Sequence, residues 1–181
     1  METVTREAHR KTHNYDASLI LIDDGSQDDT WQKIKKLKSE NKEINIDGIK
    51  LLKNFGKDTA ISAGIDYLKK DDYSFIVFLD ADLQHPIEKI PDLIQHWKEG
   101  YKVVGSKRSN ITENPLRELG SRFFYFFLKK YSDLQLITKS MDFMIVDKTV
   151  INQFKLLGGK SKSFRGSIFW LGFKTKMVEI K

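Results

Sequence analysis

The chain has 181 residues, of which 40% are hydrophobic and 12% are aromatic, and its formal net charge is +6. This size suits one domain with a hydrophobic core, so we expect residues 1–181 to form a single domain. The absence of cysteine excludes disulfides and thiolate metal sites, and the positive charge favours anionic partners. No apolar run approaches the roughly 18 residues that cross a bilayer, and the first dozen residues lack a secretory apolar segment. We therefore expect a soluble, cytoplasmic chain.

Short apolar runs alternate with segments of helical period along the chain. This alternation is typical of βαβ units and predicts an α/β fold with a mainly parallel sheet flanked by helices. In chain order, strands are expected at 18–22, 49–52, 75–79, 102–105, 143–146 and 174–180. The first helix is expected to be capped by Ser26 or Asp28, a polar loop is expected at 106–115, and an aromatic helix at 116–131.

Two pairs of carboxylates follow two of the expected strands. Asp23 and Asp24 follow the first strand, and Asp80 and Asp82 follow the strand at 75–79. Because the carboxyl ends of parallel strands meet at one edge of a sheet, the two pairs should lie side by side. An Asp-x-Asp turn can bind a hard divalent cation that bridges the phosphates of a nucleotide. Aspartate also ends strands and caps helices, so this short motif does not decide the function alone.

Three longer segments carry a resemblance to a known family. They are LILIDDGSQDDT at 19–30, LLKNFGKDTAISAG at 51–64 and FIVFLDADLQHP at 75–86, and VVGSKR, Asp142-Phe143 and Phe164-Arg165-Gly166 follow them in order. In these segments the chain resembles glycosyltransferase family 2. The resemblance is to its polyprenyl-phosphate branch, which contains dolichol-phosphate mannose synthases and bacterial bactoprenol glucosyltransferases. It extends over about residues 15–181 and implies a GT-A-type, Rossmann-like fold.

The resemblance also implies roles for particular residues. The residues that would line the donor site for the nucleotide sugar are Asp23, Asp24, Ser26, Asn54, Lys57, Asp80 and Ala81. Asp80, Asp82 and Gln84 would hold Mg²⁺ or Mn²⁺, and the acceptor phosphate would meet Lys107, Arg108, Arg117 and Ser121. The catalytic set would be Asp82, Arg117 and Arg165, in which the arginines suit phosphate because their planar fork pairs two oxygens at once.

The reaction implied is transfer of a hexose from a nucleotide-diphosphate sugar to a polyprenyl phosphate with inversion. UDP-glucose is the preferred donor and GDP-mannose the second choice. A phosphomonoester has its second pKa near about 6, so the acceptor is largely a dianion at neutral pH and needs no strong general base. The membrane surface would be a partner of the intact protein, and nucleic acid would not.

The chain departs from the family pattern in three places. The polar start METVTREAHRKT stands where relatives have an apolar first strand, the sequence ends at Lys181 before the usual membrane-proximal helices, and Met144 replaces a common arginine. We therefore expect an incomplete domain whose first strand is missing, with an open sheet edge that could pair two copies. The alternatives are an inactive or regulatory remnant, a Mg²⁺-dependent receiver domain phosphorylated on Asp80, and a nucleic-acid-binding module suggested only by charge.

Overall fold

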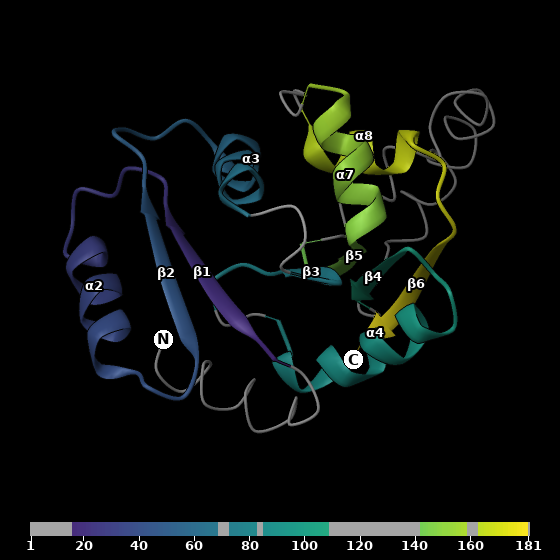
Figure 1. Ribbon diagram of the computed structural model, residues 1–181, viewed down its shortest axis with the longest axis horizontal. Helices are drawn as coiled ribbons and strands as arrows, with labels where there is room; N and C mark the ends of the chain where they lie inside the picture. The colour runs from purple at the N-terminus through teal and green to yellow at the C-terminus, as the bar shows by residue number, and fades with distance from the viewer. Residues whose placement is uncertain (1–15, 69–72, 83–84, 109–141, 159–162, 181) are drawn as a thin grey trace, which may run out of the picture.

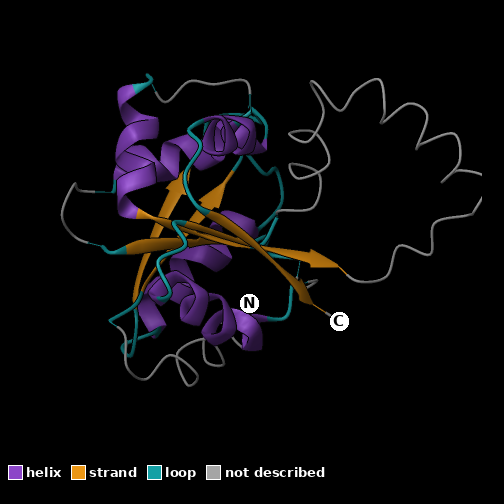
Figure 2. Ribbon diagram, turned by 90° about the vertical axis from the view of Figure 1, so that its right-hand side faces the viewer, coloured by secondary structure: helices purple, strands orange, loops and turns teal. Residues whose placement is uncertain are grey.

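The computed structural model describes residues 16–68, 73–82, 85–108, 142–158 and 163–180 (Figure 1). Within them, helices cover both faces of β-structure, which confirms the α/β class. The strands form two sheets, one of β1 and β2 and a second in the order β3-β5-β4-β6. Figure 2 shows the helices lying on either side of the strands.

The smaller sheet pairs β1 (Ser18–Asp23) in parallel with β2 (Asn45–Lys50). The connection between them contains helix α2 (Thr30–Glu40), which packs on β2. A Cβ added at Gly48 would lie 2.8 Å from Cγ2 of Ile34 and 3.1 Å from the Trp31 ring. Glycine at this position therefore lets α2 approach the strand closely.

The larger sheet contains β3 (Phe75–Phe78), β4 (Val103–Arg108), β5 (Met144–Asp147) and β6 (Thr175–Ile180). β6 is parallel to β4, whereas β5 is antiparallel to both β3 and β4, so this sheet is mixed. Its helices are α3 (Lys57–Tyr67), α4 (Ile90–Lys98), α7 (Lys148–Leu156) and α8 (Phe164–Trp170), with a 3-10 turn at Ile87–Lys89 before α4.

Side chains alternate between the two faces of β5, and this alternation divides the core in two. Met144 and Val146 pack with residues of α3, α7 and α8, among them the fully buried Phe164. Ile145 faces the other way and packs with residues of α4, such as Leu93. The alternation is the ordinary period of a strand, and it makes β5 the central strand of the molecule's main core.

Most of the expected elements are present, with shifted ends. β2 begins at Asn45 instead of Ile49, because its first half pairs with β1 and buries Ile46. β4 continues to Arg108, so the first three residues of the expected loop are strand. Among the described strands, β6 pairs with β4 alone and lies at the edge of the larger sheet. The expected helix at 116–131 lies outside the described residues.

The start of α2 also differs from the prediction. Its N-cap is Asp29, which makes no side-chain cap hydrogen bond. Ser26 instead donates its backbone N–H to Oδ1 of Asp23, while Asp28 accepts from the backbone of Thr30. The carboxylates of Asp23 and Asp28 therefore accept bonds from backbone groups within the turn. In the described part of the chain, no helix is long and apolar enough to cross a membrane.

Candidate functional site

The turn after β1 is tied to the turn after β2 by one carboxylate. Oδ1 of Asp24 accepts the backbone N–H of Phe55, and Oδ2 accepts that of Gly56, both at 2.8 Å. Oδ1 of Asn54 accepts from Gly56 as well, at 3.1 Å. Gly25 has a positive φ of 74°, and a Cβ on it would lie 2.3 Å from the Lys53 carbonyl carbon. Glycine is required here because the two turns touch through their backbones.

Asp23 is a buried carboxylate with one oxygen that lacks a partner. Its residue is 2% exposed, and its Oδ1 accepts the backbone N–H of Ser26 at 2.8 Å. Its Oδ2 is buried and makes no hydrogen bond. A buried polar atom left unpaired is costly, and such atoms in native proteins call for an explanation. Asp23 therefore keeps one acceptor oxygen without a partner, whereas both oxygens of Asp24 already hold the neighbouring turn.

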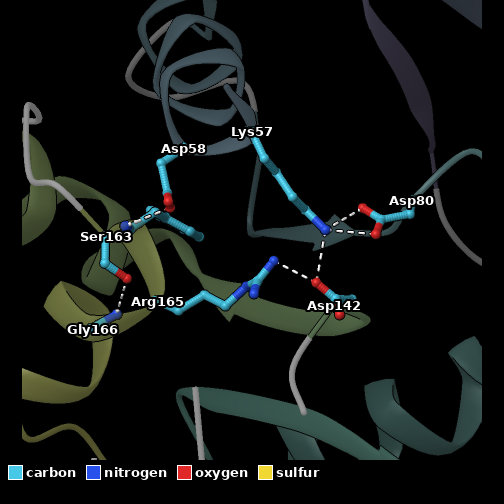
Figure 3. Close-up of polar contacts among 8 residues, drawn as sticks. Lys57, Asp58, Asp80, Asp142, Ser163, Arg165 and Gly166 are labelled. Atoms are coloured by element: carbon cyan, nitrogen blue, oxygen red, sulfur yellow. Dashed lines mark hydrogen bonds and ion pairs between the residues drawn. The ribbon is translucent and has the colours of Figure 1, made fainter. Parts of the chain in front are cut away.

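Four charged side chains meet beside the end of β3 (Figure 3). Nζ of Lys57, at the start of α3, lies 2.5 Å from Oδ1 of Asp80 and 2.7 Å from Oδ1 of Asp142. Nη2 of Arg165, on α8, donates to the same oxygen of Asp142. We call Lys57, Asp80, Asp142 and Arg165 the charge cluster. Its members come from four separate segments of the chain, so the tertiary fold alone brings them together.

Backbone contacts fix the two helices that carry the cations of the charge cluster. Oδ1 of Asp58, next to Lys57, accepts the backbone N–H of Phe164 at 2.8 Å, which joins the start of α3 to the start of α8. Ser163 caps α8 by accepting the N–H of Gly166 at 3.2 Å. Figure 3 shows both contacts beside the cluster. These contacts fix the starts of α3 and α8, and therefore the positions from which Lys57 and Arg165 extend.

The charge cluster is balanced and only partly exposed. Its two cations and two carboxylates sum to zero, and the exposed fraction of the side chains runs from 19% for Arg165 to 41% for Lys57. Burial alone would raise the pKa of Asp142, but the hydrogen bond from Lys57 and the charge of Arg165 outweigh it and lower that pKa. Asp142 is therefore ionised at neutral pH and holds both cations at one place.

The structure places the predicted site residues in three groups. Asp23, Asp24, Ser26 and Asn54 belong to the two joined turns, and Lys57, Asp80 and Arg165 belong to the charge cluster. Ala81 and Asp82 are exposed just beyond Asp80, and Lys107 is exposed on β4, outside the cluster. Gln84, Arg117, Ser121 and the side chain of Arg108 lie outside the described residues.

The sequence analysis assigned no site role to two residues of this region. Asp142 was part of the family resemblance, but its contact with both cations could not be seen because 85 positions separate it from Lys57. Asp58 has no sequence signal beyond its place in the first turn of α3. Both act through tertiary contacts that no local pattern encodes.

The acidic residues after β3 fit a divalent cation in part. Asp80 is paired with Lys57, Asp82 is exposed two residues further on, and within the described ranges no three acidic or histidine residues form a group for a metal. Mg²⁺ is commonly held by one or two carboxylates together with substrate phosphates and water. Two carboxylates at this rim are therefore compatible with a cation that arrives with a diphosphate, provided that Lys57 releases Asp80.

Comparison with known families matches residues 2–157 to the family described as Glycosyl transferase family 2. The chain belongs to glycosyl transferase family 2. Membership of this family identifies the chain as a transferase and excludes the receiver-domain interpretation. The motifs that carried the resemblance in the sequence are those that form the joined turns and supply Asp80 to the charge cluster.

The relatives of this family member include proteins named for a lipid acceptor. The "Prophage bactoprenol glucosyl transferase homolog" of Escherichia coli is 32% identical over 92% of this chain and 53% of the relative. The "Bactoprenol glucosyl transferase" of Shigella phage SfV is 32% identical over 91% of this chain and 52% of the relative. A glycosyltransferase of Bacillus subtilis is 34% identical over 92% of this chain and 50% of the relative. The chain thus spans about half the length of the curated relatives it matches.

A solved structure supports the fold. The 4-diphosphocytidyl-2C-methyl-D-erythritol synthase of Anaerococcus prevotii aligns with a TM-score of 0.63 over 97% of this chain and 74% of that protein. The two sequences are only 15% identical, so the likeness shows the Rossmann-like α/β architecture alone.

Proposed function

We propose that this chain carries the donor site of a glycosyltransferase that passes a hexose from a nucleotide-diphosphate sugar to a polyprenyl phosphate. The observation that carries the proposal is the charge cluster, which sets two cations and two carboxylates at the end of β3 beside the joined turns. The names of the bactoprenol glucosyl transferases support the acceptor class and favour UDP-glucose over GDP-mannose.

The diphosphate of the donor would lie against Lys57 and Arg165. Arg165 is only 19% exposed, so its guanidinium can pair two phosphate oxygens with less screening than a surface arginine. Asp142 holds both cations until the diphosphate arrives and then competes with it for them. When the donor binds, Lys57 and Arg165 therefore give up contacts with carboxylates and make contacts with the phosphates.

Asp80 and Asp82 would hold Mg²⁺ or Mn²⁺, together with Gln84 if its side chain reaches the same place. When bound, such a cation neutralises negative charge on the leaving nucleoside diphosphate. Lys57 must then leave Asp80, and the diphosphate supplies its new partner. The described carboxylates thus have a role in binding the cation, and Lys57 and Arg165 have a role in binding phosphate.

The free oxygen of Asp23 would accept a hydrogen bond from the base. Its burial makes an unpaired oxygen costly, so a ligand that donates an N–H there gains specificity. Uracil and guanine each present a ring N–H, whereas the corresponding nitrogen of cytosine is an acceptor. Asp23 therefore favours uridine and guanosine donors over cytidine donors, and Asp24 acts by holding the turn at Phe55 and Gly56.

The transfer is a single displacement at the anomeric carbon. An oxygen of the acceptor phosphate forms a bond to that carbon, the bond from the carbon to the diphosphate oxygen breaks, and the electron pair leaves with the nucleoside diphosphate. One displacement inverts the configuration. The acceptor phosphate is already largely ionised at neutral pH, so no proton has to be removed before attack.

A transfer assay tests this function. Radiolabelled UDP-glucose and GDP-mannose are incubated with detergent-dispersed polyprenyl phosphate and Mn²⁺, and the lipid fraction is counted. We expect transfer from one donor and loss of at least 100-fold with Asp82→Ala, while Asp92→Ala on the exposed face of α4 serves as the matched control. A folded chain that binds donor but transfers nothing would support the inactive-remnant alternative.

A further inference from the structure

The ammonium of Lys57 contacts both oxygens of the Asp80 carboxylate. Nζ of Lys57 lies 2.5 Å from Oδ1 of Asp80 and donates to Oδ2 at 2.6 Å, and Figure 3 shows the ammonium facing both oxygens. A hard divalent cation binds a carboxylate through the same oxygens. The ammonium and a divalent cation at Asp80 would therefore compete for the same two atoms.

The two carboxylates of the charge cluster depend on Lys57 to different degrees. Oδ1 of Asp142 lies 2.7 Å from Nζ of Lys57 and also accepts from Nη2 of Arg165. Within the cluster, Asp80 contacts Lys57 alone. Removing Lys57 would thus leave Asp142 paired with Arg165 but would uncover the oxygens of Asp80. Conversely, when Lys57 leaves Asp80 it can keep Asp142 as a partner.

The backbone on both sides of Lys57 is held in place, so a change of partners involves its side chain alone. The N–H of Gly56 donates to Oδ2 of Asp24 at 2.8 Å, and Oδ1 of Asp58 accepts the N–H of Phe164 at 2.8 Å. The side chain of Lys57 is 41% exposed and has a flexible four-carbon stem. Its ammonium can therefore shift away from Asp80 while α3 stays where it is.

We propose that Lys57 is a built-in competitor of the metal at Asp80 and makes metal binding depend on the diphosphate. The inference rests on the proposed function, which puts the cation on Asp80 and Asp82 and the diphosphate against Lys57. A divalent cation that binds alone must displace the ammonium from Asp80 and remain close to its charge, so it binds weakly. A diphosphate attracts the ammonium and also supplies oxygen ligands to the cation. Each ligand therefore raises the affinity for the other by the same factor.

Lys57 thus acts in opposite directions on the two ligands, because its charge attracts the diphosphate and opposes the cation. Lys57→Met keeps a long side chain and removes the charge. It should weaken nucleotide binding but strengthen binding of the cation alone. A residue that only supported the shape of the site would weaken both when replaced, so the opposite signs distinguish a competitor from a structural residue.

Titration of the whole chain with Mn²⁺, with the free ion measured by electron paramagnetic resonance, tests this without any turnover. The wild type, Lys57→Met and Lys57→Gln are each titrated with Mn²⁺ alone and again with saturating UDP, GDP or pyrophosphate, and circular dichroism checks their folding. The matched control is Lys38→Met, which removes an ammonium that lies 2.6 Å from Asp47 on the smaller sheet.

We expect Mn²⁺ alone to bind both Lys57 variants at least tenfold more tightly than the wild type. The factor by which the diphosphate tightens Mn²⁺ binding should fall at least threefold in these variants, because the part of the coupling that comes from release of Asp80 is lost. Lys38→Met should match the wild type in both measurements, because Asp47 is not part of the site.

Three results would overturn the proposal. The first is that folded Lys57 variants bind Mn²⁺ alone no more tightly than the wild type. The second is that the coupling factor stays unchanged in them, and the third is that Lys38→Met gains as much Mn²⁺ affinity as they do. If none of the diphosphates binds the wild type, the proposed function fails, and the titrations with Mn²⁺ alone still decide whether Lys57 competes for Asp80.

Discussion

The two sheets differ in how deeply their residues are buried. The larger sheet and its helices contain nearly all of the fully buried large side chains, including Phe143, Phe154 and Phe164. In β1, β2 and α2, the buried residues are Ile34, Ile46 and the carboxylate Asp23. Since buried apolar area is the main source of stability, the larger sheet should hold the fold and the smaller one should be the weaker part. The candidate site uses both sheets, and the joined turns, where we propose that the base binds, lie on the weaker side.

The largest loss of stability is expected for a substitution in the core of the larger sheet. Phe164 is fully buried and its ring lies 4.9 Å from Phe78 and 5.1 Å from Phe154, measured between centroids. Phe164→Ala should lower the free energy of unfolding by about 3–5 kcal/mol through the cavity it leaves. Leu21→Ala in half-buried β1 should cost about 1–2 kcal/mol. Urea unfolding of both variants checks the difference, and equal losses would show that the two sheets are equally packed.

A second effect concerns the contact between the turns of the smaller sheet. A methyl group at Gly25 would meet the backbone of Lys53 and Asn54 at 2.3–2.6 Å, and the residue has a positive φ. Gly25→Ala should therefore cost about 2–3 kcal/mol and speed exchange of the β1 amides. Gly100 also has a positive φ, of 92°, but nothing lies within 4 Å of its Cβ position. Gly100→Ala is the matched control and should cost only about 1 kcal/mol.

Asp147 gives a smaller, pH-dependent effect on the larger sheet. Burial would raise its pKa, but hydrogen bonds from Thr149, Lys102 and Trp97 outweigh burial and lower the pKa below its ordinary value of 3.8. A lowered pKa in the folded state means that the stabilisation is present above the unfolded value and is lost as pH falls through the folded value. Asp147→Ala should cost about 2 kcal/mol at pH 7, because it removes the cap of α7 and a partner of Lys102.

The measurement for Asp147 is the unfolding free energy from pH 7 down to pH 2. The difference between wild type and Asp147→Ala should shrink at the acid end, where the wild-type carboxyl becomes protonated. Asp147→Asn keeps an oxygen for the Thr149 cap and loses the charge. Its free energy of unfolding at pH 7 should therefore lie between those of the wild type and Asp147→Ala. A difference that stays constant with pH would mean that the charge of Asp147 does not contribute.

The sequence predicted the fold class and the positions of the strands along the chain because both depend on local apolar periodicity, but it did not predict that β5 runs antiparallel to β3 and β4. The family motifs assigned Lys57 and Asp80 to the donor site and Arg165 to the catalytic set, and the structure places all three in the charge cluster. The sequence did not predict the pairing of Asp142 or the different environments of Asp23 and Asp24, because adjacent identical residues give the same local signal. It placed the start of β2 too late, since residues 45–48 become strand only by pairing with β1.

Binding of the donor by the charge cluster is the central claim, and calorimetry tests it most directly. The chain is titrated with UDP, GDP, CDP and UDP-glucose in Mn²⁺ and then in EDTA, alongside Asp82→Ala, Lys57→Ala and the exposed control Lys174→Ala. We predict metal-dependent binding of UDP or GDP that Asp82→Ala abolishes, that Lys57→Ala weakens at least tenfold and that Lys174→Ala leaves unchanged. A folded chain that binds none of these nucleotides, or that binds them equally well without Lys57, would contradict the claim.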